Sequence, residues 1–438
     1  MTADRKRIVI VGGGAAGLEL AARLSRRRGR RRHDILLVDR NRTHIWKPLL
    51  HEVAAGALDA NIDEVGYRAH CHRWGYSYVH GTLDSVDTAG RTIRIAPLLD
   101  EDGSELIAGH DLAYDVLVLA FGSVTNDFGT PGVAEHCLFL DSRAQADRFR
   151  DKLLNHCLRV SRAMTHHADP DAHVRIAIIG AGATGVELAA ELFNAADALG
   201  DLGLETFDAA RLAVTLIEAG PRILPALPER LADAARRELE KLGVRVATGL
   251  QVSEVTAHEI VTAGGERIGA ELKVWAAGVK ATPIAGALAG LELNRIGQII
   301  VSPTLQSLSD GRVFAIGDCA SCQLPGAART VPPRAQAAHQ MASSVADNIR
   351  RLLADEPLRD FVYRDKGSLV SLSRYSTVGN LMGGLAGGAL AIEGRIARFV
   401  YTSLYRMHLI AIHGWPKGLA LIAVGHVNAI VRPRIKLH

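Results

Sequence analysis

Two glycine-rich turns, each between a hydrophobic strand and a helix, constrain this chain more than any other feature of its sequence. Both have the spacing Gly-x-Gly-x-x-Gly, formed first by Gly12, Gly14 and Gly17 and again by Gly180, Gly182 and Gly185. The apolar runs at 7–11 and 174–179 predict buried strands, and the segments at 15–27 and 184–199 predict helices. Strands that alternate with helices in this way predict an α/β fold with two Rossmann-like, doubly wound domains.

Each turn is suited to a dinucleotide. The first glycine allows a tight turn, the second lets a pyrophosphate approach the backbone, and the third permits close packing of helix on strand. The phosphates then lie at the helix N-terminus. In both copies an acid ends the next strand, Asp39 in the first and Glu218 in the second, where its carboxylate can accept the ribose hydroxyls. Two such sites imply FAD and a nicotinamide nucleotide, although their order does not say which binds where.

The acid of the second turn also bears on the choice of nicotinamide nucleotide. Glu218 would repel the 2′-phosphate of NADPH, so the sequence favours NADH. Arg222 lies close to it in the sequence and weakens that preference, because a guanidinium could pair with the same phosphate.

The distribution of charge argues for an anionic surface as partner and against nucleic acid. The chain has 51 Lys and Arg against 47 Asp and Glu, but residues 395–438 contain seven Lys or Arg and no acid. Two apolar segments with helical spacing, 396–412 and 417–431, lie in this tail and are too short to span a bilayer. Six arginines within 26–32 predict a solvated helix end, with a phospholipid contact as the alternative.

Cysteine and histidine usage excludes further classes. Five Cys, an odd number, predict no disulfide framework and a reducing compartment. No metal site is expected, because the His residues have no Cys or acidic partners at ligand spacing. No signal peptide is expected, since the N-terminus leads almost directly into a strand.

Four further motifs complete a resemblance to a known family. They are Trp46-Lys-Pro-Leu-Leu50, Leu119-Ala-Phe-Gly122, Trp275-Ala-Ala-Gly278 and Ile316-Gly-Asp318. With the two glycine turns they make the chain resemble, over essentially its whole length, the type II NADH dehydrogenases. These are single-subunit, non-pumping NADH:quinone reductases among the flavoproteins with two dinucleotide-binding domains. The resemblance implies that the first turn binds FAD non-covalently and that the second binds NADH as substrate.

The resemblance also implies further cofactor contacts and an acceptor site. Expected near FAD are Ala16, Lys47, Ala120, Gly122, Gly317, Asp318 and Ala337; expected near NADH are Thr184 and Gly278. Ala335-Gln-Ala-Ala-His-Gln340 resembles the family motif that lines the quinone pocket. Its Gln336 and Gln340 are four apart, so they share one helical face, with ordinary helix polarity as the alternative. Lys366 resembles a family lysine near the flavin, and Glu187 a carboxylate that positions nicotinamide or supplies a proton.

The expected organisation has three parts. Residues 1–125 and 285–365 form a discontinuous FAD-binding domain, and 126–284 form the NADH-binding domain. Residues 366–438 form a C-terminal module of amphipathic helices that binds an anionic membrane surface or a second copy in a homodimer. The resemblance implies a peripheral enzyme on the cytoplasmic face of a bacterial inner membrane.

Two other readings of the same fold stay open. Cys319 and Cys322 form a Cys-x-x-Cys pair typical of disulfide reductases, but they follow Asp318 in the position of a flavin-binding segment, which favours packing. Sulfide:quinone reductase shares the fold and would use paired cysteines such as Cys157 and Cys322, although an intact second turn with Glu218 suits NADH. A flavoprotein with a structural or signalling role is the alternative from another class.

Overall fold

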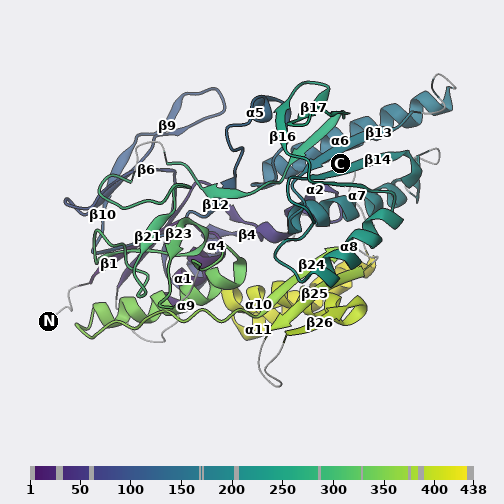
Figure 1. Ribbon diagram of the computed structural model, residues 1–438. Helices are drawn as coiled ribbons and strands as arrows, with labels where there is room; N and C mark the ends of the chain where they lie inside the picture. Colours follow the sequence, from purple (N-terminus) through teal and green to yellow (C-terminus); the bar gives the residue numbers. More distant parts are fainter. Residues whose placement is uncertain are drawn as a thin grey trace. The chain divides into compact units, whose positions relative to one another are not determined.

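The computed structural model describes residues 5–25, 33–58, 64–166, 169, 172–201, 207–284, 288–326, 329–372, 376–382 and 389–431. Contacts divide the chain into two compact units (Figure 1). The first unit comprises Met1–Trp46, Glu64–Val124 and Lys280–Asp365, and the second comprises Lys47–Asp63, Thr125–Val279 and Lys366–His438. Residues 47–63 and 366–438 therefore both group with the unit that contains the second glycine turn.

The first unit is built on a parallel sheet of five strands in the order β22-β11-β1-β2-β5. These are β1 (Arg7–Val11), β2 (Asp34–Asp39), β5 (Ser77–His80), β11 (Val116–Leu119) and β22 (Val313–Ala315). In the central strand Ile8, Val9 and Ile10 are fully buried. Such uninterrupted apolar strands are typical of a parallel sheet that is covered on both faces.

Two helices and several short elements complete the first unit. Helix α1 (Ala15–Ser25) packs against α9 (Ala335–Leu352). An antiparallel meander has the order β10-β7-β6, with β6 (Leu83–Asp87), β7 (Thr92–Ile95) and β10 (His110–Ala113). The remaining elements are β3 (Thr43–His44), β4 (Val65–Gly66), α4 (Tyr67–Trp74), β8 (Leu98–Leu99), β9 (Glu105–Ile107), β21 (Ile299–Val301), η3 (Gly317–Cys319) and β23 (Ala320–Cys322).

The second unit repeats this plan with a parallel sheet in the order β15-β14-β13-β19. Its strands are β13 (Val174–Ile179), β14 (Leu212–Glu218), β15 (Arg245–Thr248) and β19 (Leu272–Trp275). Its helices are η1 (Lys47–Leu49), α2 (Leu50–Ala54), α5 (Val133–His136), α6 (Arg143–Thr165), α7 (Ala183–Asp201), η2 (Ala209–Arg211) and α8 (Glu229–Lys241). The antiparallel strands β16 (Val252–Val255), β17 (Glu259–Thr262) and β18 (Arg267–Gly269) form its meander. Two short strands, β12 (Ser123–Thr125) and β20 (Val279–Ala281), lie at the unit boundaries.

The C-terminal part of the second unit contains a sheet as well as helices. Strands β24 (Gly367–Leu372), β25 (Ser376–Met382) and β26 (Ala389–Glu393) form an antiparallel sheet. Helix α10 (Gly394–His413) packs on β25 and on α11 (Trp415–Val431). Among the described helices, none combines the length and apolar character that crossing a membrane requires.

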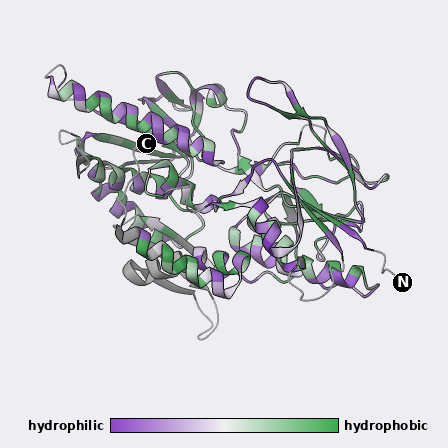
Figure 2. Cartoon of the chain, turned by 180° about the vertical axis from the view of Figure 1, so that it is seen from behind, coloured by the Kyte–Doolittle hydropathy of each residue, from purple (hydrophilic) through white to green (hydrophobic). Residues whose placement is uncertain are grey.

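The predicted strand–turn–helix units are confirmed. Both glycine turns lie between a strand and a helix, and the parallel pairs β1–β2 and β13–β14 follow each other as predicted. The sheet β24–β26 was not predicted from the sequence. Figure 2 shows purple and green residues alternating along the helices, as expected for helices with one face on a sheet and one in water. The arginine run 26–32 lies outside the described residues.

Candidate functional site

The first glycine turn is closed by protein on two sides and open on the third. Gly12 has φ +104°, and a Cβ there would lie 2.3 Å from the Ala120 carbonyl oxygen. A Cβ on Gly17 would lie 1.8 Å from the Gly12 carbonyl oxygen. A Cβ on Gly14 would meet no atom within 4 Å. The open side is thus the one where the glycine pattern requires a phosphate to approach, and the turn fits a dinucleotide.

Asp39 supports this turn through its carboxylate. Its Oδ2 accepts a hydrogen bond from the Gly13 amide at 2.6 Å, and its Oδ1 accepts one from the Asn41 amide at 2.7 Å. Burial raises the pKa of Asp39, while these backbone bonds oppose the rise. Tyr67, from α4, donates to the Gly13 carbonyl at 2.7 Å and is 2% exposed. The turn is therefore held by side chains on both sides of Gly13.

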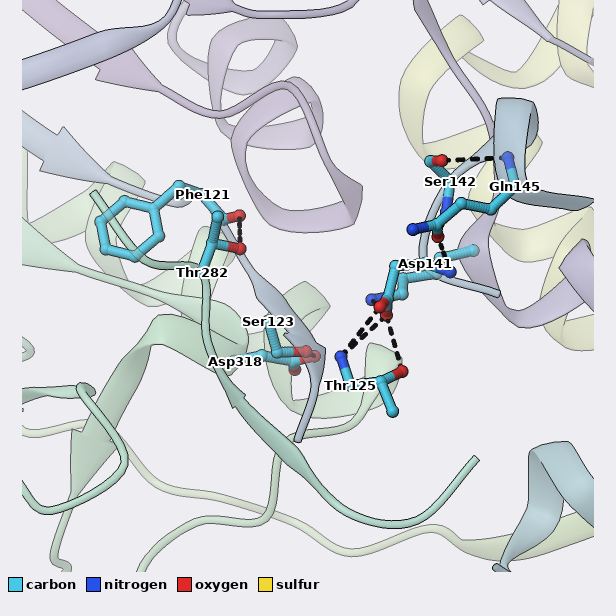
Figure 3. Close-up of polar contacts among 9 residues, drawn as sticks. Phe121, Ser123, Thr125, Asp141, Ser142, Gln145, Thr282 and Asp318 are labelled. Atoms are coloured by element: carbon cyan, nitrogen blue, oxygen red, sulfur yellow. Dashed lines mark hydrogen bonds and ion pairs between the residues drawn. The ribbon is translucent and has the colours of Figure 1, made fainter. Parts of the chain in front are cut away.

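Residues from three distant segments meet around Asp318 in the first unit. The Ser123 hydroxyl donates to Asp318 Oδ2 at 2.7 Å, as Figure 3 shows. Gln298 Nε2 donates to the Asp318 carbonyl at 2.8 Å. Gly317 has φ +73°, and a Cβ there would lie 3.7 Å from the Cβ atoms of Ala16 and Ala338. These contacts bring Asp318 and Ala16, both expected near FAD, into the same part of the unit.

The other expected FAD contacts of this unit are backbone positions. Ala120 donates to the Val11 carbonyl at 2.7 Å, and Gly122 has φ +74°. Ala337 is 2% exposed, and its amide donates to the Arg334 carbonyl at 2.9 Å. In Figure 3 the Thr282 hydroxyl donates to the Phe121 carbonyl, at 3.2 Å, which fixes the backbone just before Gly122.

The second glycine turn repeats the geometry of the first. Gly180 has φ +103°, and a Cβ there would lie 2.7 Å from the Ala277 backbone. A Cβ on Gly185 would lie 2.0 Å from the Gly180 carbonyl, whereas one on Gly182 would meet no atom within 4 Å. Thr184 is exposed in the first turn of α7, where helix amides have no partner within the helix. This arrangement fits a second dinucleotide.

Glu218 is held in the same way as Asp39. Its Oε2 accepts from the Ala181 amide and its Oε1 from the Gly220 amide, both at 2.8 Å. Arg222, which could have favoured NADPH, donates to the carbonyls of Leu227 at 2.8 Å and Pro225 at 3.0 Å. Its guanidinium is therefore committed to the backbone, which strengthens the preference for NADH.

Gly278 follows β19, where only a small residue fits. It has φ +65°, and a Cβ there would lie 2.6 Å from the Phe128 ring. Its carbonyl accepts from the Asn126 amide at 3.3 Å, and Trp275 Nε1 donates to the Asn126 carbonyl at 2.8 Å. These bonds tie the end of β19 to segment 126–128 in the second unit.

Lys47 has a carboxylate partner that the sequence did not indicate. Its Nζ lies 3.1 Å from Asp141 Oδ1, and the Asp141 side chain is only 10% exposed. Asp141 also accepts from the Thr125 amide, at 3.0 Å to Oδ1 and 2.9 Å to Oδ2, and from its hydroxyl at 3.1 Å (Figure 3). The next residue, Ser142, caps α6 with Gln145. Asp141 thus anchors the start of η1 to the start of α6.

Glu187 is buried in the second unit, in the second turn of α7. The Ser371 amide of β24 donates to its Oε1 at 3.1 Å, and His51 Nδ1 of α2 lies 3.5 Å from its Oε2. The carboxyl group therefore connects three segments that are far apart in the sequence.

Gln336 and Gln340 lie on one side of α9, as predicted, and both contact the segment 364–365. Gln336 Nε2 donates to Asp365 Oδ1 at 3.0 Å. Gln340 Nε2 donates to the Arg364 carbonyl, and its Oε1 accepts from the Arg364 amide, both at 2.9 Å. Lys366 comes directly after this segment and is exposed, and the following Gly367 has φ +97°. In this structure the amide groups hold the chain that leads to Lys366.

The cysteines of the Cys-x-x-Cys pair are both free and buried. Cys319 Sγ donates to the carbonyls of Ile316 at 3.3 Å and Leu119 at 3.4 Å, and Cys322 Sγ donates to the Ser302 carbonyl at 3.9 Å. Burial raises the pKa of Cys319 to about 12 and that of Cys322 to about 11. Neither thiol is prepared for thiolate chemistry near neutral pH.

Four residues that hold the expected site residues in place could not be identified from the sequence. Tyr67, Asp141, His51 and Ser123 act through contacts with residues between 54 and 195 positions away. Lys47, the partner of Asp141, lies within the motif Trp46–Leu50 and His51 directly follows it, which is the only hint that the sequence offered.

A model of the pyridine nucleotide-disulphide oxidoreductase family matches residues 6–342. A type II NADH:quinone oxidoreductase of Haemophilus influenzae is 45% identical over 444 residues, which cover 99% of this chain and 100% of that protein. The type II NADH:quinone oxidoreductase Ndh of Mycobacterium tuberculosis is 31% identical, over 93% of this chain and 85% of that protein. The structure of NDH2 from Plasmodium falciparum in complex with NADH matches with a TM-score of 0.81 at 18% identity, covering 99% of this chain and 100% of that one.

Proposed function

The chain belongs to the type II NADH:quinone oxidoreductases, within the pyridine nucleotide-disulphide oxidoreductase family, and we propose that it transfers two electrons from NADH to a membrane quinone without pumping protons. The observation that carries this proposal is the pair of complete glycine turns, each with an open phosphate side and an acid held by backbone amides. FAD, when bound, would supply the redox chemistry between NADH and the quinone. The protein orients the nucleotides, excludes water from the site and supplies protons.

Each unit takes one nucleotide in this proposal. In the first unit, Gly12, Gly14 and Gly17 receive the FAD pyrophosphate, Asp39 binds its ribose, and Asp318 orients its ribityl chain. In the second unit, Gly180, Gly182 and Gly185 receive NADH, with Thr184 at the helix N-terminus and Glu218 at the ribose. Gly278 lies after β19, where a side chain would meet the Phe128 ring. We keep the nucleotide-binding domains at the boundaries expected from the sequence, although residues 47–63, expected in the FAD domain, and 366–438, expected as a separate module, both group with the second unit.

The absorption spectrum of the purified protein tests the proposal. Flavin bands that bleach with one equivalent of NADH without oxygen, and return on addition of a soluble quinone, are the expected result. Gly182→Val should keep the flavin but lose bleaching, because its side chain would occupy the phosphate position without meeting protein. A protein without flavin bands, or one whose bands NADH leaves unchanged, contradicts the proposal.

The preference for NADH over NADPH follows from Glu218 and from Arg222, whose guanidinium is bonded to backbone carbonyls. We expect kcat/KM for NADH to exceed that for NADPH by at least about tenfold, or about 1.4 kcal/mol. Glu218→Ala should reduce the ratio of kcat/KM for NADH to that for NADPH. Arg222→Ala should leave this ratio unchanged, because the guanidinium binds backbone carbonyls. Equal kcat/KM values in the unaltered protein would overturn this assignment.

Four residues are assigned to the acceptor side of the reaction. We assign Glu187 to proton supply or nicotinamide positioning and Lys366 to the neighbourhood of the flavin, as the family resemblance implies. Gln336 and Gln340 are assigned to the quinone side, where they also fix segment 364–365. The sulfide:quinone reductase alternative has less support, because Cys319 and Cys322 are buried thiols bound to carbonyls.

The C-terminal helices are proposed to bind the cytoplasmic leaflet. Large apolar side chains are exposed along α11 and on α10, namely Met407 at 47%, Trp415 at 69%, Leu419 at 52%, Val424 at 54% and Val427 at 59%. With seven Lys or Arg and no acid in 395–438, these surfaces suit an interface between acyl chains and lipid phosphates. A homodimer would cover the same side chains, and sedimentation distinguishes the two.

Point variants on α11 test membrane binding without removing the helix. Leu419→Ser with Val427→Ser should weaken flotation with anionic vesicles, because less apolar area enters the membrane. NADH bleaching of the flavin serves as the control and should be unchanged. If the double variant floats as well as the unaltered protein, these side chains do not anchor it.

A further inference from the structure

His51 is placed between two carboxyl groups of the second unit. Its Nδ1 lies 3.5 Å from Glu187 Oε2, and its Nε2 lies 3.9 Å from Glu52 Oε1. The side chains of His51 and Glu187 are 3% and 8% exposed, whereas that of Glu52 is 26% exposed. The imidazole therefore stands between a buried carboxyl group and one that reaches solvent.

The ring is suited to pass a proton and not to keep one. Burial lowers the pKa of His51 to about 4, so the ring is neutral near pH 7. A neutral imidazole has one N–H and one lone pair, and can bind a proton at one nitrogen while releasing one from the other. The ring also donates a hydrogen bond to the Pro48 carbonyl.

Glu187 also contacts the backbone of β24. The Ser371 amide occupies Oε1, at 3.1 Å. Glu191, one turn further along α7, is also buried, and its Oε1 accepts from Asn194 Nδ2 at 2.6 Å. A purely structural contact between α2 and α7 needs no ionisable groups. Apolar side chains would pack there without the free-energy cost of burying a carboxyl group. A chemical use is the better account of the pair.

The stoichiometry of the proposed reaction requires proton delivery, which is a chemical role that this pair of residues could have. A hydride carries two electrons and one proton, while a quinone reduced to a quinol gains two electrons and two protons. One proton per turnover must therefore come from solvent. Since Glu187 is the proposed proton donor and is buried, it needs a path by which to be reprotonated.

We propose that His51 relays protons from Glu52 to Glu187. The Glu52 carboxyl group releases a proton to Nε2, Nδ1 releases its own proton to the Glu187 carboxylate, and Glu52 is reprotonated from water. No electrons move in these steps, and the ring returns to its starting state when water takes the proton from Nε2 and returns one to Nδ1. This inference rests on the proposed function of Glu187 in proton supply.

Stopped-flow measurement of the two half-reactions tests the relay. In His51→Phe, reoxidation of the NADH-reduced protein by a soluble quinone should slow at least about tenfold, the low end for a proton-transferring group. Proton uptake, followed with a pH-indicator dye, should slow equally. The NADH dissociation constant and flavin reduction by NADH should stay close to the wild-type values, because neither needs a proton from solvent.

Matched variants separate a relay from a structural role. His51→Gln keeps a donor and an acceptor but cannot pass a proton, so it should slow reoxidation like His51→Phe while raising thermal stability relative to it. Glu52→Gln should slow reoxidation less, because water can replace Glu52. His70→Phe removes a buried imidazole bound to Tyr76, at 2.8 Å, and should not slow proton uptake.

Each failure has a distinct meaning. If His51→Gln reoxidises and takes up protons at the wild-type rate while Glu187→Gln is slow, the relay is wrong and the role of Glu187 stands. If both half-reactions slow together in His51→Gln, the residue is structural and the relay is again wrong. If Glu187→Gln is also unaffected, the proposed role of Glu187 fails with it.

Discussion

At the residue scale, glycines of one motif have different duties in the folded protein. Gly17 and Gly185 face carbonyl oxygens at distances that no Cβ could share, 1.8 and 2.0 Å, whereas Gly14 and Gly182 face open space. Packing of the fold requires the first pair, and the second pair leaves the space that the proposed nucleotides need. The sequence pattern assigns all four the same importance, and only the packed structure separates them.

This difference predicts opposite phenotypes within one turn. Gly17→Ala should lower the melting temperature of the protein, because the backbone of the turn must move. Gly14→Ala should leave the fold intact and weaken FAD retention, because the methyl group would meet the pyrophosphate. Melting with excess FAD and flavin content after gel filtration check both expectations, and equal melting temperatures for the two variants would contradict them.

The two cysteines near Asp318 also act at the residue scale. Since burial raises the pKa of Cys319 to about 12 and that of Cys322 to about 11, both stay protonated at pH 8. We expect Cys319→Ser with Cys322→Ser to retain NADH:quinone activity, and the native protein to react slowly with thiol reagents at these positions. Loss of activity with flavin still bound would instead support a disulfide or sulfide chemistry.

At the scale of elements, α9 connects the proposed quinone side to the chain before β24. The Gln340 amide bonds the Arg364 backbone both as donor and as acceptor, so this contact does not depend on the Arg364 side chain. The helix is fixed elsewhere by Glu19 of α1, whose Oε2 lies 2.6 Å from His339 Nδ1. The position of α9 is thus determined by its contacts with segment 364–365 and with α1.

Gln340→Glu tests whether the amide mainly stabilises segment 364–365 or mainly contacts the quinone. The carboxylate keeps the acceptor for the Arg364 amide but faces the Arg364 carbonyl without a donor, so we expect a loss of about 1 kcal/mol of stability. Arg364→Ala is the matched control and should lose little. If the melting temperature is unchanged while the KM for quinone rises, Gln340 acts on the quinone alone.

At the scale of the whole molecule, buried neutral histidines predict sensitivity to acid. Burial lowers the pKa of both His44 and His51 to about 4, from 6.5 in an exposed setting. As pH falls from 6.5 towards 4, the unfolded chain binds protons that the folded chain does not, so stability falls with pH across this window. Each residue contributes roughly 3 kcal/mol to this loss.

Melting temperature as a function of pH checks this expectation. The native protein should lose stability between pH 6.5 and 4, and the loss should level off below the folded pKa. His44→Gln should show a smaller loss over the same range, because a group that titrates only in the unfolded state has been removed. A flat profile across this window would show that these rings are protonated in the folded protein.

The sequence by itself determined both nucleotide turns, their flanking strands and helices, and the acids at Asp39 and Glu218. These features depend on local spacing, since an apolar strand, three glycines and a terminal acid lie within about forty residues of one another. The shared face of Gln336 and Gln340 is local for the same reason, because helix periodicity brings residues four apart together.

Only the tertiary structure decided the partners of these residues. Asp141 beside Lys47, His51 beside Glu187, and the backbone of Arg364 beside Gln340 come from distant segments. The β24–β26 sheet is decided in the same way, because its strands are stabilised by pairing with each other and by packing on α10. Side-chain partners in a packed interior depend on which surfaces meet, and local sequence pattern does not encode that.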